Sequence, residues 1–150
     1  MIDEGGNKPI DILLVEDNPG DIRLTQEALK EEKLHVGLYV VNDGIKAMAF
    51  LRKQAEYRDV PTPDLILLDL NLPQKDGREV LKEIKSDNGL KRIPVVILTT
   101  SEAEEDILKS YNLHANCYIR KPVDLDQFMN VIKYIKNFWL TIVKLPGKQI

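Results

Sequence analysis

Short apolar runs alternate along the chain with longer segments in which apolar residues recur at helical spacing. Each run has the length of one strand buried on both faces, and each longer segment has room for a crossover helix. The alternation predicts a parallel sheet covered by helices on both faces. The predicted strands are residues 12–15, 36–41, 65–68, 95–98 and 117–119. The predicted helices are residues 21–32, 45–53, 77–85, 102–113 and 125–138.

Local sequence signals agree with this alternation. Asn18 followed by Pro19 suits the N-cap and the first position of the first helix. Residues 101–104 resemble a capping box that opens the fourth helix. Gly77 is expected to serve a turn before the third helix. The stretch 54–64, which contains two prolines, is expected to run over the surface as a long connection.

The length and composition fit one folded unit. The chain has 150 residues, of which 43% are hydrophobic and 30% charged, a balance typical of a globular protein with an apolar core. We therefore expect a single domain over residues 1–150, with a core of about residues 9–140. Residues 1–8 are expected to form a flexible tail and residues 141–150 a C-terminal tail.

Charge and targeting signals exclude several classes of function. The formal net charge is -3, from 21 Lys and Arg against 24 Asp and Glu, and no basic block could neutralise a row of phosphates. We therefore expect no nucleic-acid partner. No apolar run approaches the roughly 20 residues of a membrane helix, so we expect no membrane association and a cytoplasmic location. The single cysteine, Cys117, is expected to be structural.

Acidic residues follow two of the predicted strands. Glu16 and Asp17 come directly after the first strand, and Asp69 comes directly after the third. The carboxyl ends of parallel strands meet at one edge of the sheet, where ligands bind in folds of this kind. Carboxylates brought within about 4 Å repel by a few kcal/mol, so the cluster requires protonation or a cation. Mg²⁺ is the expected cation, because it takes one or two carboxylates and keeps several waters.

The two remaining strand ends add a hydroxyl and an ammonium. Thr99 ends the fourth strand, although the residue chemistry alone does not separate it from Thr100, and Lys121 follows the fifth strand. Both groups can bind phosphate oxygens. Together with the acidic cluster they form a set that can accept a phosphoryl group as an aspartyl phosphate on Asp69.

Four segments give this set a family resemblance. ILLVEDN, LILLDLNLPQKDG, IPVVILTTS and CYIRKP resemble, in order and spacing, the receiver domains of response regulators in two-component signalling. The resemblance covers about residues 11–139. It implies a flavodoxin-like, doubly wound (βα)5 fold with strand order 2-1-3-4-5, and a phosphoacceptor switch rather than an enzyme with turnover. Such a switch assists its own phosphorylation and dephosphorylation.

The resemblance also implies a role for each site residue. The phosphoacceptor maps onto Asp69, and the magnesium ligands onto Glu16, Asp17, Asp69 and the backbone carbonyl of Asn71. The catalytic lysine maps onto Lys121, the switch hydroxyl onto Thr99 and the switch aromatic onto Tyr118. Glu in the first position of the acidic pair departs from the commonest pattern, which makes Asp17 the safer direct ligand.

Further segments resemble a subgroup of the family. AMAFLRKQAEY, DGREVLKEIK and NFWLTIVKLP are similar to segments of the small phytochrome-associated response regulators, which are stand-alone receivers. This likeness implies a sensor histidine kinase as the phosphoryl donor, with a phytochrome-like kinase as the candidate. It also implies a homodimer formed through the fourth helix, the fifth strand and the fifth helix.

Each site residue also has an ordinary structural interpretation. Glu16 and Asp17 could be acids that favour a helix N-terminus, and Asp69 could be a polar residue that closes a buried strand. An unpaired acid after four aliphatic residues would be costly, which favours function at Asp69. Lys121 could be a solvated surface lysine, and Tyr118 a half-buried strand aromatic.

Two other classes of function compete with a receiver. A haloacid-dehalogenase phosphatase also uses an aspartate at a strand end, but its pattern has a second aspartate two residues later, where this chain has Asn71. A flavodoxin-like module for a nucleotide or flavin would need a phosphate-binding loop rich in glycine after the first strand, and none is present there.

Overall fold

The computed structural model describes residues 10–31, 36–99 and 117–121, together with residues 126, 129, 130 and 133. For residues 31, 99 and 117 it describes the backbone alone. The predicted fourth helix, at 102–113, and both predicted tails lie outside the described residues. The four described residues within the predicted fifth helix, at 125–138, are helical.

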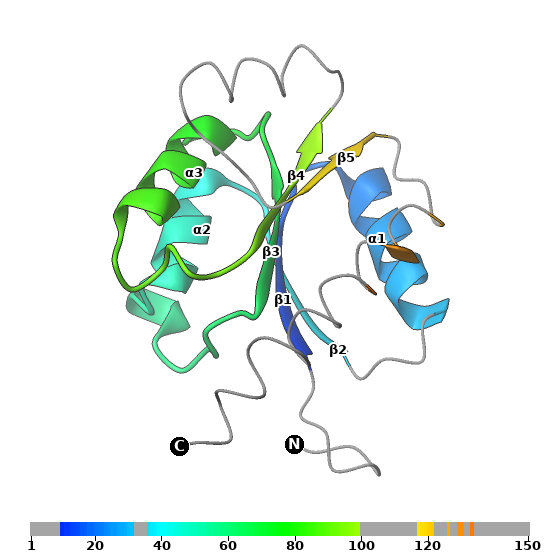
Figure 1. Ribbon diagram of the computed structural model, residues 1–150. Coiled ribbons are helices and arrows are strands. Elements are labelled where there is room, and N and C mark those ends of the chain that lie inside the picture. Colours follow the sequence, from blue (N-terminus) through cyan, green and yellow to red (C-terminus); the bar gives the residue numbers. More distant parts are fainter. Residues whose placement is uncertain are drawn as a thin grey trace, which may run out of the picture.

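The described strands form one parallel sheet with helices on both of its faces. The strand order is β2-β1-β3-β4-β5, so the predicted fold class and strand order are both confirmed. Figure 1 shows α1 on one face of the sheet and α2 and α3 on the other. The strands are β1 (Ile10–Val15), β2 (Val36–Val41), β3 (Leu65–Asp69), β4 (Val95–Thr99) and β5 (Cys117–Arg120). The helices are α1 (Pro19–Glu31), α2 (Gly44–Leu51), α3 (Gly77–Ser86) and the short 3₁₀ helix η1 (Ala55–Tyr57).

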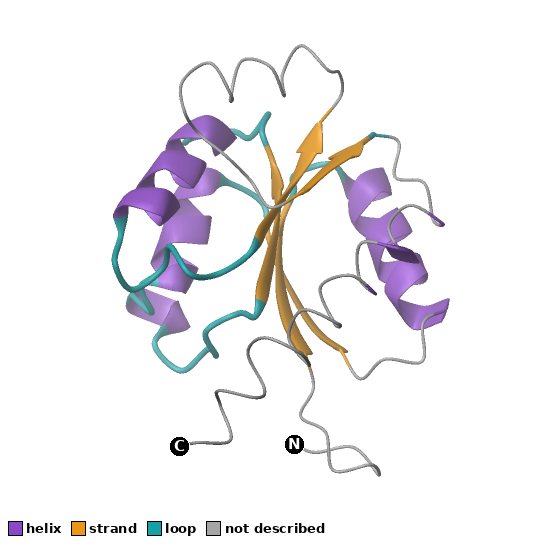
Figure 2. Ribbon diagram, viewed as in Figure 1, coloured by secondary structure: helices purple, strands orange, loops and turns teal. Residues whose placement is uncertain are grey.

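The sheet separates two apolar clusters of side chains, and Figure 2 shows helices on both sides of the strands. The side chains of β3 alternate between the layers: Ile66 and Leu68 join the cluster under α2 and α3, whereas Leu65 and Leu67 join the cluster under α1. All four are fully buried. Burial of each such side chain stabilises the fold by about 1.5–3 kcal/mol, which explains why these runs adopt the two-sided positions of a covered sheet.

The strand register brings the strand ends to one edge. Val15, the last residue of β1, lies opposite Leu68 of β3, and Asp69 of β3 lies opposite Leu98 of β4. Thr99, the last residue of β4, lies opposite Arg120 of β5. Asp69 at the end of β3 and the residues that directly follow β1 and β5 therefore lie at the same edge of the sheet. This register sets the positions of Glu16, Asp69 and Lys121.

The ends of the first two helices follow local chemistry. The side chain of Asn18 accepts a hydrogen bond from the Asp21 backbone N–H at 3.0 Å, which confirms the predicted cap. The helix begins at Pro19, two residues before the predicted start. The next helix ends at Leu51 rather than at residue 53, because Lys53 has a φ of 56°, which α-helical backbone does not allow.

The long connection before β3 runs over the surface as predicted, and most of its side chains are exposed. It contains η1, whose Tyr57 packs its ring 5.5 Å from the ring of Phe50 in α2. The Lys53 ammonium donates a hydrogen bond to the Val60 carbonyl at 2.6 Å. No helix among the described residues is both long and apolar enough to cross a bilayer.

Glycine is required at position 77 for a different reason from the one predicted. It is the first residue of α3 and not a turn residue. A Cβ atom there would overlap the carbonyl oxygen of Asp69 and lie 2.6 Å from Cα of Leu70. The Gly77 N–H also donates to the Leu70 carbonyl at 3.0 Å. Glycine at this position therefore allows α3 to start against the end of β3.

Candidate functional site

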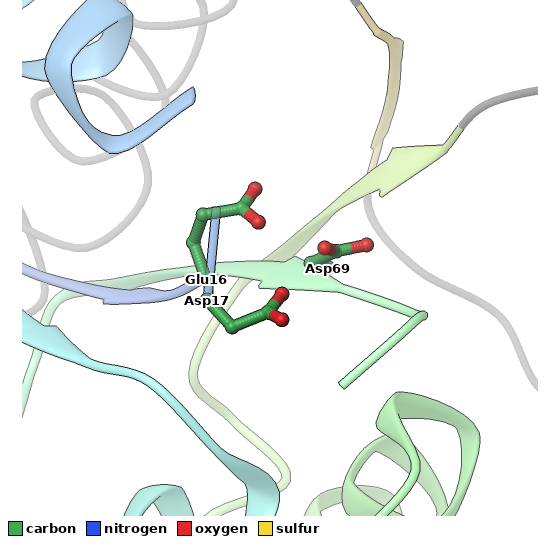
Figure 3. Close-up of side chains that lie close together, drawn as sticks. All are labelled: Glu16, Asp17 and Asp69. Atoms are coloured by element: carbon green, nitrogen blue, oxygen red, sulfur yellow. The ribbon is translucent and has the colours of Figure 1, made fainter. Parts of the chain in front are cut away.

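Three carboxylates converge at the carboxyl edge of the sheet, as the sequence predicts. Glu16, Asp17 and Asp69 each offer an oxygen atom, and these atoms lie within 4.8 Å of one another. Figure 3 shows the three side chains at the ends of two neighbouring strands. Glu16 and Asp69 are buried, with exposed fractions of 0% and 3%, whereas Asp17 is exposed. The cluster therefore has a buried side and a side that faces solvent.

Lys121 joins this cluster directly. Its ammonium donates a hydrogen bond to Asp69 Oδ2 at 2.9 Å and forms ion pairs with Glu16 Oε1 at 2.8 Å and Asp21 Oδ2 at 3.0 Å. Its side chain is only 12% exposed, so the interpretation as a solvated surface lysine is wrong. β4 separates β5 from β3 in the sheet, so the side chain spans β4 to reach the acceptor strand.

The acidic groups and the lysine change one another's ionisation. Burial raises the pKa of the Glu16 carboxyl from its ordinary 4.5 to about 7; Lys121 opposes the rise and Asp69 adds to it. For Lys121, burial acts to lower the pKa, but the surrounding carboxylates of Glu16, Asp69 and Asp21 outweigh burial and raise it. The site therefore has more negative charge than one ammonium balances, and it retains a proton on Glu16 or gains a second cation.

Backbone groups fix the two buried carboxylates. The Asn71 N–H donates to Asp69 Oδ1 at 3.1 Å, so the two oxygens of Asp69 have different partners. The Asn18 N–H donates to Glu16 Oε2 at 3.2 Å. An open pocket reaches Asp69 but not Glu16, and its lining includes Asp17, Asn18, Asp69, Asn71 and Lys121. Asp69 can therefore be reached from solvent by a donor that enters this pocket.

The structure says less about the two predicted switch residues, Thr99 and Tyr118. Thr99 ends β4, one residue beyond the partner of Asp69 in the register, and its side chain lies outside the described residues. Tyr118 lies on β5, half-buried, and packs against the apolar cluster under α2 and α3. The switch roles of both residues stay predictions.

Asp21 is the site residue that sequence reasoning missed. It lies in the first turn of α1 and contacts the Lys121 ammonium. An acid in the first turn of a helix is common because the helix dipole favours it. Its position therefore marks the start of the helix and does not by itself indicate a site residue. Asp17 precedes the helix, which begins at Pro19, so no helical spacing in the sequence links Asp21 to the acidic pair.

Comparison with known proteins identifies the class that this fold and site define. The family model for the response regulator receiver domain matches residues 12–133. The chain belongs to the response regulator receiver family. It is 54% identical to the response regulator Rcp1 of Synechocystis sp., over 98% of this chain and 99% of that protein. The predicted likeness to phytochrome-associated response regulators is confirmed by the 57% identity to the cyanobacterial phytochrome response regulator RcpA.

Two solved structures extend this likeness. The phosphorylated cyanobacterial phytochrome response regulator RcpA has 57% sequence identity and a TM-score of 0.75, with 89% of this chain and 96% of that chain covered. The Mn²⁺-bound form of Rcp1 has 54% identity and a TM-score of 0.74, with the same coverage. One of these relatives is therefore described as phosphorylated, and the other as binding a divalent metal.

Proposed function

We propose that this protein is a phosphorylation switch in which Asp69 accepts a phosphoryl group from a sensor histidine kinase in a Mg²⁺-dependent reaction. The observation that carries the proposal is the convergence of Lys121 and three carboxylates on the end of β3. Asp69 is the one carboxylate of that cluster that is buried, bonded to the lysine and part of the wall of the open pocket.

The donor set suits magnesium. Hard divalent cations prefer oxygen ligands, and Mg²⁺ combines one or two carboxylates with phosphate oxygens and water. Asp17 and Asp69 would contact the ion, with Glu16 behind them and the backbone carbonyl of Asn71 beside them. The pKa of Glu16 is raised first by burial and then by the neighbouring Asp69 carboxylate, so a cation beside Asp69 would offset the smaller of the two causes. When bound, the ion would neutralise the oxygens of the phosphoryl group.

The chain's own residues supply the remaining chemistry. An oxygen of Asp69 would attack the phosphorus atom in line, so that a carboxylate O–P bond forms while the N–P bond of the donor phosphohistidine breaks. The Lys121 ammonium, now on Asp69 Oδ2, would transfer its hydrogen bond to a phosphoryl oxygen. The Asn71 N–H on Asp69 Oδ1 would hold the acceptor in a fixed orientation during the transfer.

The output is proposed to be binding rather than turnover. The Thr99 hydroxyl would move toward the new phosphoryl group, and the Tyr118 ring would turn inward, which changes the surface formed by the predicted fourth helix, β5 and the predicted fifth helix. That surface would bind a partner or a second copy of this chain as a homodimer. Tyr118 is half-buried against the apolar cluster under α2 and α3. This position at the edge of the core supports the proposed inward turn of its ring.

The donor is proposed to be a phytochrome-like sensor histidine kinase, and the location of both proteins the cytoplasm. This assignment rests on the relatives: RcpA is described as a phytochrome response regulator, and a bacteriophytochrome response regulator is 42% identical to this chain over 88% of it.

The test is phosphotransfer from candidate histidine kinases to the wild type and to Asp69→Asn in the presence of Mg²⁺. We expect the wild type to gain the mass of one phosphoryl group and Asp69→Asn to gain none. Oligomeric state is measured before and after transfer. Unchanged mass of the wild type with every kinase and with acetyl phosphate, or catalytic hydrolysis of phosphate esters that requires Asp69, would contradict the proposal.

A further inference from the structure

The loop between β3 and α3 has an unusual backbone. Gln74 has a φ of 68°, and the Lys75 N–H donates to the Pro73 carbonyl at 2.7 Å. A hydrogen bond across a single residue with positive φ defines a γ-turn of the rare, strained kind. Such a conformation persists only where the surrounding structure enforces it. The same loop carries Asn71, the proposed carbonyl ligand of the metal.

The N-terminus of α2 contacts this turn. The Gly44 N–H lies 3.5 Å from the Pro73 carbonyl oxygen, which also accepts from Lys75. A Cβ atom on Gly44 would overlap the Lys75 carbonyl oxygen and come within 2.7 Å of the Lys75 Cβ. The Gly44 φ is not in the positive region, so the requirement for glycine here is space and not conformation. Any other residue must displace the backbone of Lys75.

Hydrogen bonds anchor the loop on both sides of the turn. Its first part is held by the hydrogen bond of the Asn71 N–H to Asp69 Oδ1, and its last residue precedes Gly77, whose N–H is bonded to Leu70. Pro73 has a fixed φ. A loop that is short, anchored at both ends and stiffened by proline has little room to absorb a shift locally.

We propose that Gly44 is a positioning residue for the metal site: by lacking a side chain it allows α2 to hold the γ-turn at residues 73–75, and thereby sets the direction of the Asn71 carbonyl. This inference rests on the proposed function. It predicts that Gly44→Ala weakens binding of Mg²⁺ even though Ala favours helices more than Gly does. Changes behind a metal ligand typically cost 10–100-fold in affinity, and we expect a loss of about tenfold.

The experiment compares Gly44→Ala with the wild type and with Gly89→Ala. Gly89 lies beyond α3, and the nearest atom that a Cβ there would meet is a side-chain oxygen of Asp87 at 3.3 Å. Affinity for Mg²⁺ is measured by calorimetry at a temperature where all three proteins are folded, and the amide resonance of Asn71 is recorded by NMR. The amide resonance reports the loop directly, without any reaction.

We expect the Asn71 resonance to shift and the dissociation constant for Mg²⁺ to rise about tenfold in Gly44→Ala, with Gly89→Ala unchanged. Phosphorylation by acetyl phosphate at limiting Mg²⁺ should fall in proportion, and excess Mg²⁺ should restore most of it. Gly44→Ala that melts at a lower temperature but binds Mg²⁺ within about twofold of the wild type would overturn the inference, since Gly44 would then serve packing alone.

A second pair of variants tests the same contact from the loop if Gly44→Ala does not fold. Lys75→Ala removes only the ion pair with Glu83 on α3, whereas Lys75→Gly also removes the Cβ that faces Gly44 and frees the backbone. We expect Lys75→Gly to bind Mg²⁺ several-fold more weakly than Lys75→Ala; equal affinities would overturn the inference. A wild type that neither binds Mg²⁺ nor accepts phosphate would refute the proposed function, and the positioning role with it.

Discussion

Removing the Lys121 ammonium should destabilise the metal-free protein in a way that depends on pH. Lys121→Met keeps much of the apolar stem but leaves the buried Glu16 and Asp69 without their common cation. Removing one partner of a buried ion pair costs about 3–5 kcal/mol. Glu16 relieves part of this cost by taking up a proton, so we expect a loss in unfolding free energy of about 3 kcal/mol at pH 8.

The sign of the pH dependence follows from Glu16. Its pKa in the folded protein, about 7, lies above the ordinary 4.5, so its contribution to stability is present below the ordinary pKa and is lost as pH rises through about 7. Lys121 lowers the pKa of Glu16, so the pKa is higher still in Lys121→Met. The stability that is lost as pH rises is therefore larger in the variant than in the wild type. At pH 5, where Glu16 is protonated in both proteins, we expect Lys121→Met to cost only about 1–2 kcal/mol.

The assay is urea unfolding at pH 5 and pH 8 in the presence of a chelator, with Lys82→Met as the matched control. Lys82 is an exposed lysine of α3, and its replacement should change stability by less than about 0.5 kcal/mol at either pH. Saturating Mg²⁺ should reduce the cost of Lys121→Met, because a second cation then offsets the carboxylates. A loss below about 1 kcal/mol at both pH values would refute the electrostatic account of the site.

Three further predictions concern Glu16, Gly77 and Asn18. Affinity for Mg²⁺, measured by calorimetry, should increase as pH rises from 6 to 8, because Glu16 with a pKa of about 7 must lose its proton; a flat profile in the wild type, or the same pH dependence in Glu16→Gln, would contradict this. Gly77→Ala should lower the unfolding free energy by about 1–3 kcal/mol, because its Cβ would overlap the Asp69 carbonyl oxygen; a neutral result in urea unfolding would contradict this. Asn18→Ala should lower it by about 1 kcal/mol through loss of the cap on the Asp21 N–H, whereas Asn18→Asp should not.

The sheet and the acidic cluster were predictable because each depends on local pattern plus one topological rule. Buried parallel strands have apolar residues on both faces, so the continuous apolar run from Leu65 to Leu68 predicts such a strand. Once the strands are known, residues that follow them must meet at one edge, and Glu16 and Asp69 do so. The family resemblance added the individual roles and the order of the strands.

The features that sequence reasoning missed depend on contacts between elements. Asp21 meets Lys121 only because α1 and the end of β5 lie close together in space. Gly77 and Gly44 are required by backbone atoms of other segments, and no periodicity of apolar residues encodes such an approach. The early end of α2 follows from the positive φ of Lys53. Lysine favours helices, so its residue type does not predict this conformation.

The central claim is that Asp69 accepts the phosphoryl group beside a divalent cation and Lys121. The most direct test is a crystal structure of the protein bound to Mg²⁺ and beryllofluoride, a stable mimic of the phosphoryl group. The account predicts a beryllium–oxygen bond to Asp69, a cation in contact with Asp17 and Asp69, and the Lys121 ammonium on a fluorine atom. Beryllofluoride bound away from Asp69, or Lys121 directed away from it in the presence of the cation, would contradict the account.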